Sequence, residues 1–294
     1  MDASDPRPYA PPASGVNRAV AAVIGAVVLL GAGTWWWQQR AAAPAATVAP
    51  ATPTAAAPAE AASAASAEPA ILHPIEASAA AGARELPPLD QSDAAMKQAL
   101  TGLVGSRAVA LLLQTDGFVR RVVATVDNLG RAHAAPRLWP VVPPSGRFAV
   151  QDGGDRTRMA AANAARYDTF VALAMSVDPA RAAAIYRAHY PLFQAAYRDL
   201  GYPKGYFNDR LVEVIDQLLA TPEPAGPLEV RLTEVKGPIE ADRPWVRFEF
   251  ADPALQSLPA GSKMLLRMGN EHARRLKAQL RAFRDAVASA PLKN

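Results

Sequence analysis

The chain has 294 residues, enough for one or two domains, and a formal net charge of +4. Because this small basic excess is spread along the chain, no nucleic acid or other polyanionic partner is predicted. The sequence contains no cysteine, which excludes disulfide bonds, thiolate catalysis and cysteine metal sites.

An uncharged stretch, AVAAVIGAVVLLGAGTWWW, occupies residues 19–37. A helix of roughly twenty apolar residues is long enough to cross a bilayer. The stretch ends in consecutive tryptophans, which are typical of the membrane–water interface. We therefore expect a short cytoplasmic tail over residues 1–18 and a transmembrane helix over residues 19–37. A cleaved signal peptide is the alternative, because small residues follow at Ala41, Ala42 and Ala43.

The basic residues favour one orientation of this helix. Arg7 and Arg18 precede it, whereas Arg40 is followed by no Lys or Arg until Arg84. Positive residues concentrate on the cytoplasmic side of membranes. The sequence thus predicts a single-pass membrane protein whose short tail lies inside and whose large C-terminal part lies outside the cytoplasm, which is the periplasm of a bacterial inner-membrane protein if the family resemblance given below holds; with the opposite orientation it would be a cytoplasmic regulator. Residues 38–88 are rich in Ala and Pro and lack core-forming periodicity, which predicts a disordered tether.

Residues 89–290 have the size of one globular domain, and their patterns predict an α+β fold that is mainly helical. Ser92 is placed to cap a first helix. The segments SRAVALLL and FVRRVVATV indicate two more, and the second should stop at Asp127, Asn128 and Gly130.

A long helix is expected from about Thr157 to Met175, and Asp178 is a good N-cap for the next one. The following stretch, residues 190–219, is dense in tyrosine and phenylalanine and should form the core of the domain. Pro191 lies inside a helical pattern there, so that helix must kink or restart.

The last third changes its hydrophobic period. The segments LEVRLTEV and WVRFEF alternate apolar and polar residues, which predicts an antiparallel β-hairpin with a long loop. A final helix is expected from about Pro259 to Val287, with an exposed stripe of basic residues.

Strong catalytic and cofactor motifs are missing from the sequence. It contains no Walker loop, GxGxxG, HExxH or GxSxG pattern, and its four histidines do not have metal-ligand spacing. We therefore predict no cofactor and no metal site, and regard an enzyme as less expected than a binding protein.

Two polar residues lie at helix positions where buried apolar residues are expected. Asn163 and Arg166 fall near the centre of the inward face of the expected 157–175 helix. Buried polar groups there need partners. A structural ion pair would satisfy them, and the alternative is a ligand-binding pocket lined by Asn163, Arg166 and Tyr167.

A buried Arg166 would require a carboxylate. The expected partners are Asp127, which with Asn128 more simply ends a helix, and the carboxylates around the turn of Asn208 and Asp209. These residues complete the set of binding candidates.

An acidic stripe offers a rival function. Paired carboxylates could perform acid–base hydrolysis in the cell envelope, provided that two of them lie about 5–10 Å apart in a cleft. The stripe consists of Asp209, Glu213 and Asp216, and the candidates for a hydrolase are Asp127, Asp168, Asp209 and Glu213. A solvent-exposed face is the simpler interpretation of the stripe.

The runs VATVDNL, NAARYD, YPLFQAAYRDLGYP, FNDRLVEVIDQLL and LRMG, in this order, resemble the family known as domain of unknown function 3014. The resemblance covers residues 89–288, and Gly130 stands where the family pattern leads us to expect proline. It implies a proteobacterial envelope protein with one membrane span, a Pro/Ala-rich tether and no assigned activity. It supplies no catalytic residues.

Taken together, the sequence predicts a non-enzymatic interaction or scaffold module of the cell envelope. Its partners would be the inner membrane, through residues 19–37, and an envelope protein or cell-wall polymer. The envelope hydrolase is the alternative.

Overall fold

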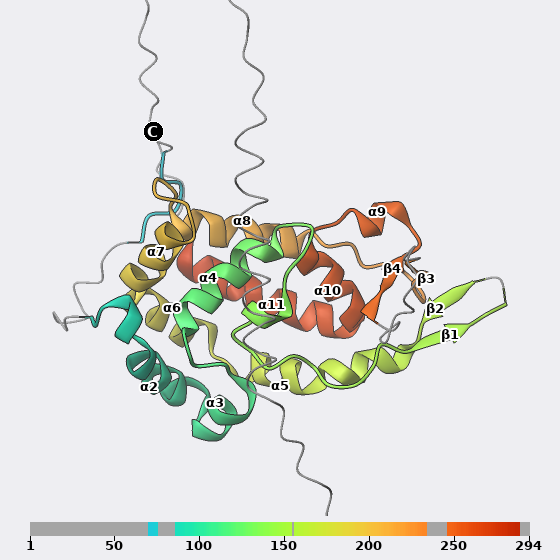
Figure 1. Cartoon of the computed structure of the whole chain (residues 1–294), viewed down its shortest axis with the longest axis horizontal. Helices are drawn as coiled ribbons and strands as arrows, with labels where there is room; N and C mark the ends of the chain where they lie inside the picture. Colours follow the sequence, from blue (N-terminus) through green and yellow to red (C-terminus); the bar gives the residue numbers. More distant parts are fainter. Residues whose placement is uncertain (1–69, 76–85, 155, 234–245, 289–294) are drawn as a thin grey trace, which may run out of the picture. The chain divides into compact units, whose positions relative to one another are not determined.

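The computed structural model describes residues 70–75, 86–154, 156–233 and 246–288. They form a mainly helical domain with two small antiparallel sheets of two strands each (Figure 1). The predicted transmembrane helix over 19–37 lies outside these residues. Within them, no helix combines the length and hydropathy that a membrane crossing requires.

The first helices follow the predicted segments. They are η1 (Leu89–Gln91), α2 (Asp93–Val104), α3 (Ser106–Leu112), α4 (Phe118–Leu129) and η2 (Pro136–Leu138). Ser92 occupies the predicted N-cap position of α2, but its hydroxyl makes no capping bond and donates to the Leu89 carbonyl at 2.7 Å. The carboxylate of Asp93 caps the start of α4, where it accepts from the backbone N–H of Gly117 at 2.8 Å and of Phe118 at 3.3 Å.

The predicted long helix over 157–175 is wrong. Its first residues form a hairpin of β1 (Val150–Asp152) and β2 (Thr157–Met159), followed by the 3₁₀ helix η3 (Ala161–Tyr167) and then α5 (Asp168–Ser176). The side chain of Asn163 bonds to both backbone groups of Ala149 and to the Ala160 carbonyl. These local bonds compete with α-helical pairing and hold the chain in a tighter turn.

Three helices then build the main core, as predicted for residues 190–219. They are α6 (Pro179–Ala188), α7 (Tyr190–Asp199) and α8 (Phe207–Leu219). The side chain of Asp178 caps α6, accepting from the backbone N–H of Ala180 at 2.8 Å. The helix restarts at Pro191, which lies in the first turn of α7, where its missing N–H has no helical partner to lose.

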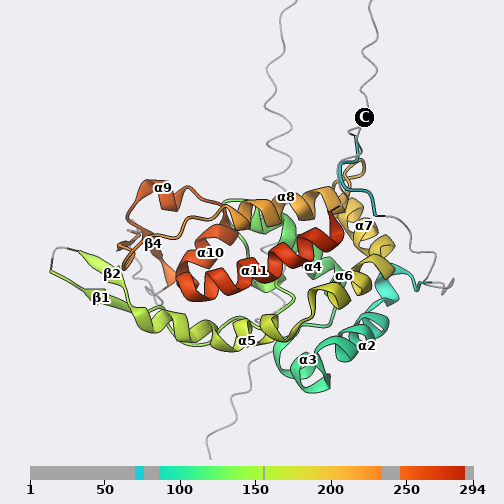
Figure 2. The same cartoon turned by 180° about the vertical axis from the view of Figure 1, so that it is seen from behind.

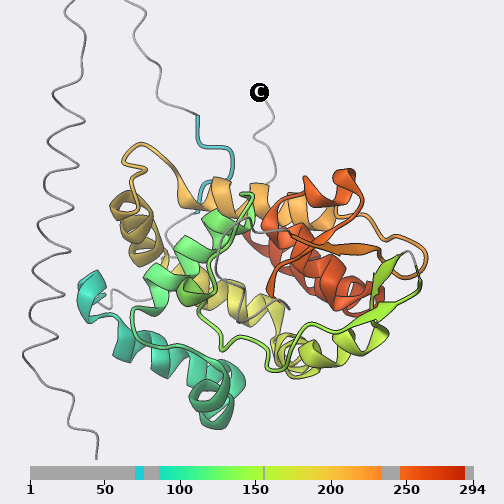
Figure 3. The same ribbon diagram turned by 45° about the vertical axis from the view of Figure 1, so that its right-hand side comes forward.

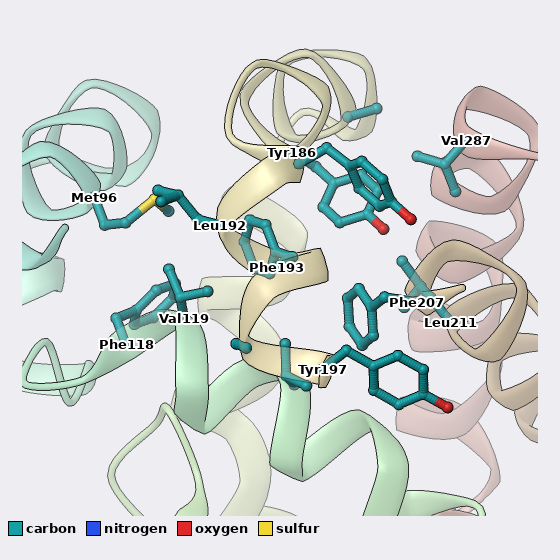
Figure 4. Packing of buried hydrophobic residues seen from close by; sticks show 14 of the residues in the cluster. Met96, Phe118, Val119, Tyr186, Leu192, Phe193, Tyr197, Phe207, Leu211 and Val287 are labelled. Atoms are coloured by element: carbon teal, nitrogen blue, oxygen red, sulfur yellow. The ribbon is translucent and has the colours of Figure 1, made fainter. Parts of the chain in front are cut away.

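Aromatic rings from these helices meet in the middle of the core (Figure 4). Phe207 has no exposed surface, and its ring lies 6.1 Å from that of Phe193 and 5.5 Å from that of Tyr197. Tyr186 adds a third helix to the cluster, with its ring 5.2 Å from Phe193. Burial of such rings contributes most of the hydrophobic stabilisation at this point.

The C-terminal part contains the predicted hairpin and a broken helix. The strands β3 (Val230–Leu232) and β4 (Phe248–Phe250) pair antiparallel, with Arg231 opposite Glu249. The short α9 (Pro253–Gln256) precedes α10 (Ala260–Met268) and α11 (Asn270–Val287). The predicted single helix over 259–287 is wrong, because Gly269 has φ of 84° and interrupts it.

The long helix α11 is the centre of the arrangement. It packs against α5, α6, α8 and α10, and Figure 2 shows α8 and α5 on its two sides. The α2–α3 pair and the β-hairpins lie at opposite ends of the domain (Figure 3). A third hydrophobic cluster joins the two hairpins to α10 through Val230, Phe250 and Leu266.

One part of the predicted tether is packed on the domain. Residues 70–75 lie beside the start of α8, where Asp209 accepts hydrogen bonds from their backbone. For these residues the prediction of a disordered tether over 38–88 is wrong, because Ile75 packs against the main core. The rest of the tether up to residue 69, and residues 76–85, lie outside the described residues.

Candidate functional site

The predicted site residues lie in three separate places. The first is the end of α4, where Asp127 is 5% exposed. Its carboxylate accepts from Arg131 Nε at 2.9 Å, lies 3.3 Å from Arg210 Nε and accepts from the Tyr202 hydroxyl at 3.2 Å. Two guanidinium groups neutralise this buried charge, so Asp127 holds α4, α8 and the α7–α8 loop together rather than facing a ligand. Asn128 is half-buried in the last turn of α4, which ends one residue later as predicted.

The second place is η3. Asn163 is 1% exposed and all its hydrogen bonds are to backbone groups of Ala149 and Ala160. Arg166 is half-buried and donates to the carbonyls of Ser145 and Gly146, both at 3.2 Å. The prediction that Arg166 is buried and charge-paired is therefore wrong: in η3 the residue turns toward the loop before β1, and its guanidinium stays close to solvent.

The third place is the start of α8. Asn208 has no exposed surface and connects α6, α8 and α11, because it accepts from the Tyr186 hydroxyl and donates to the Val287 carbonyl. Asp209 accepts from the backbone of residues 72 and 73. Among the described residues, no hydrogen bond or ion pair joins Asn208 or Asp209 to Arg166 or Asp127.

Two of the four carboxylates of the hydrolase alternative lie close together, because Asp127 and Glu213 share Arg210, whose Nη1 lies 2.9 Å from Glu213. The other two are engaged elsewhere: Asp168 accepts from His272 Nε2 at 2.8 Å, and Asp209 holds residues 70–75. None of the four lines either of the two cavities described below. In the part of the chain that the structure describes, no group of three or more His, Asp or Glu could hold a metal ion.

A polar cavity of about 650 Å³ lies elsewhere, between η3, β4, α10 and the loop after α4. Of the predicted residues, only Tyr167 lines it. Its polar wall comes from Arg247, Glu249, Lys263 and Arg267. Lys263 and Arg267 are one helical turn apart on α10, so both reach the same side of the helix.

Lys263 is 9% exposed, yet it has no carboxylate within 4.0 Å in the described chain. Its Nζ donates to the Gln256 carbonyl at 3.2 Å. Burial, and then the positive charge of Arg267, lower the pKa of Lys263. The charged amine is thus held in a place where it is less stable than in water.

Arg267 has a similar environment. Its Nη2 donates to the Phe248 carbonyl at 2.9 Å, and its guanidinium lies 5.4 Å from the ring centre of Phe250 and 6.0 Å from that of Phe148. Burial lowers the pKa of Arg267, and the nearby charge of Arg166 lowers it further, whereas Tyr167 and Glu249 act in the opposite direction. Aromatic rings and one carbonyl also stabilise the cation, and in the described chain no carboxylate lies within 4.0 Å of it.

Two further groups in the wall bear on the charge of the cavity. The indole N–H of Trp139 is buried and has no hydrogen-bond partner in the described structure, which leaves a donor unsatisfied. Glu249 is the one described carboxylate in the lining, and it lies 3.8 Å from Arg231 of the paired strand. The cavity therefore has an excess of positive charge and of donors.

The sequence contained a signal for this cavity. The segment AGSKMLLRM places two cations four residues apart in a helix without any acidic residue. Like charges at this spacing repel each other, and no i,i+4 carboxylate compensates them. The other walls come from distant parts of the chain, and no local pattern shows that they meet α10.

A second cavity, of about 350 Å³, lies between α5, α8, α10 and α11. Its lining is almost wholly apolar and includes Phe170, Met264, Met268 and Phe283. Such a surface has few polar groups to orient a ligand, in contrast to the charged cavity.

Comparison with known proteins gives one match. No curated protein and no solved structure matches the chain. The family described as "Protein of unknown function (DUF3014)" matches residues 118–284, which is more than half of the chain and runs from the start of α4 to near the end of α11. The cationic cavity, which is the cavity lined by Lys263 and Arg267, lies within the matched region. This chain therefore belongs to the family described as Protein of unknown function (DUF3014).

Proposed function

We propose that this protein is a non-enzymatic interaction module of the bacterial cell envelope, which binds an anionic group of its partner in the Lys263–Arg267 cavity. One observation carries the proposal: two cations on one face of α10 are largely withdrawn from solvent without a described carboxylate to neutralise them. A buried cation costs free energy unless it is paired. An anionic ligand would supply the missing charge.

The chemistry of the cavity suits a carboxylate or a phosphate. The Arg267 guanidinium can offer a planar pair of donors and Lys263 a point charge, and both groups bind these anions. Envelope proteins and cell-wall polymers carry carboxylates, and phospholipids carry phosphates. With a single described carboxylate in the lining, Glu249, the cavity lacks the pair that acid–base hydrolysis uses.

The proposed location follows from the charge pattern of the first forty residues. Residues 19–37 would anchor the chain in the inner membrane, and the domain would lie in the periplasm. A tethered binding domain gains from this arrangement, because the anchor holds it close to partners that share the compartment.

Thermal unfolding of the full-length protein tests the proposed cavity. Inorganic phosphate and acetate, each added against chloride at equal ionic strength, should raise the melting temperature as their concentration rises, because a ligand of the folded state stabilises it. Lys263→Met and Arg267→Met should lose at least tenfold in apparent affinity, which corresponds to about 1.4 kcal/mol.

The matched control is Arg281→Met, which removes an exposed cation from α11 and should leave the anion effect unchanged. Without anion, Lys263→Met should melt at or above the wild-type temperature, because replacing an unpaired buried charge by an apolar side chain removes its desolvation cost. Equal anion effects in the wild type and both cavity variants would reject the proposed site.

A further inference from the structure

Residues 70–75 lie against the domain beside the start of α8, with a bend at Leu72 and His73 (Figure 1, cyan). They precede the region matched by the family and do not form a helix or strand of the domain. The contacts that hold them come from Tyr206, Asn208 and Asp209.

The domain binds the backbone of this segment. The Asp209 carboxylate accepts from Leu72 N at 3.0 Å and from His73 N at 2.7 Å. The Tyr206 hydroxyl accepts from Ile75 N at 2.7 Å, and Asn208 Nδ2 donates to the His73 carbonyl at 2.8 Å. Four hydrogen bonds thus go to main-chain groups over four successive residues.

The pattern of bonds fits the sequence of the segment. Position 74 is a proline, which has no N–H, and the N–H groups that donate to the domain are those of residues 72, 73 and 75. The Ile75 side chain packs against the main core, whereas Leu72 is 65% exposed. Recognition therefore uses main-chain groups and one apolar anchor after proline.

The receptor residues are fixed by the core of the domain. Asn208 has no exposed surface, and its amide is oriented by the Tyr186 hydroxyl and the Val287 carbonyl. Its backbone N–H donates to the Tyr190 hydroxyl at 3.3 Å. Helices α6, α7 and α11 thus position the acceptors and donors independently of the segment, and a preorganised site binds with a smaller entropic cost.

We propose that this surface is a peptide-binding site for segments in which proline is followed by a branched apolar residue, and that residues 70–75 occupy it in cis. An equivalent segment of another chain can enter only when residues 70–75 leave. Recognition of a peptide through its main chain, with pockets for a few side chains, is common among peptide-binding domains. The site is separate from the Lys263–Arg267 cavity, with which it shares no described residue.

Competition with a peptide tests this proposal on the full-length protein. The probe is a fluorescent peptide of residues 69–77, PAILHPIEA, and the measurement is its anisotropy. His73→Pro with Ile75→Gly in the chain removes one donor and the anchor of the cis segment. The peptide should bind this variant at least tenfold more tightly than the wild type, in which the cis segment competes.

Adding Asp209→Ala to the same variant should lower peptide affinity at least tenfold. Tyr206→Phe is the second receptor variant, which removes the acceptor for Ile75 N and should also weaken binding. Glu213→Gln, an exposed carboxylate one turn further along α8, is the matched control and should have no effect. Failure of the peptide to bind the His73→Pro/Ile75→Gly chain, or equal binding after loss of Asp209 and of the Tyr206 hydroxyl, would overturn the proposal.

Discussion

Two buried lysines show what is unusual about the cationic cavity. Lys277 on α11 is 8% exposed and Lys263 on α10 is 9% exposed. Lys277 donates to the Thr221 carbonyl at 2.6 Å and to Glu223 at 3.1 Å, so its charge is neutralised. Lys263 has only a carbonyl at 3.2 Å. Within one domain, the same residue type at the same burial is paired with a carboxylate in one place and has only a carbonyl partner among the described residues in the other.

Two substitutions in η3 compare the stability contributions of the buried Asn163 and the half-buried Arg166. Asn163→Ala should lower the free energy of unfolding by about 2–4 kcal/mol, because it removes the three hydrogen bonds that this buried side chain makes to the backbone of Ala149 and Ala160. Arg166→Ala should cost less than about 1.5 kcal/mol, because the guanidinium lies near solvent and binds two carbonyls. Urea denaturation measures both values. A larger loss for Arg166→Ala would show that this arginine has a buried charge partner.

Helix ends were predictable where a residue acts through its own backbone. Proline fixes φ and has no N–H, so the restart near Pro191 could be inferred from sequence alone. The hairpin of β1 and β2 could not, because each strand has three residues and Gln151 and Asp152 are exposed, which leaves no alternation to detect. The break at Gly269 was missed, because glycine inside a helical pattern is also compatible with an unbroken helix.

The junction of α10 and α11 gives a test at the element scale. Gly269 has φ of 84° and ψ of 158°, a conformation nearly restricted to glycine, and a Cβ there would meet Ala164 at an ordinary 3.8 Å. Gly269→Ala should therefore cost about 1–3 kcal/mol through backbone strain alone. Gly102→Ala is the control, because this exposed glycine lies inside α2 with open space around it, and it should gain about 0.5–1 kcal/mol. Chemical denaturation would contradict the assignment if both variants were equally stable.

The candidate cavity shows the limit of sequence analysis for the whole molecule. Its walls come from the loop after α4, η3, β4 and α10, which are more than a hundred residues apart at the extremes. The hydrophobic patterns indicated most helices and the hairpin of β3 and β4, because each of these elements has its own local period of apolar residues. The meeting of Trp139, Arg247 and Lys263 depends on tertiary packing, which has no local period. Family membership does not fill this gap, because the family has no described activity.

The topology of the chain gives the last prediction, which rests on sequence. If Arg7 and Arg18 lie in the cytoplasm, a reporter that is active only in the periplasm should be active when fused after Ala290. A reporter that functions only in the cytoplasm should be inactive at the same position. As a control, Arg7→Glu and Arg18→Glu combined with Ala41→Lys and Ala42→Lys reverse the charge bias and should reduce the periplasmic signal, since basic residues flanking a span resist export. Cytoplasmic activity of the wild-type fusion would reject both the orientation and the envelope partner proposed for the cationic cavity.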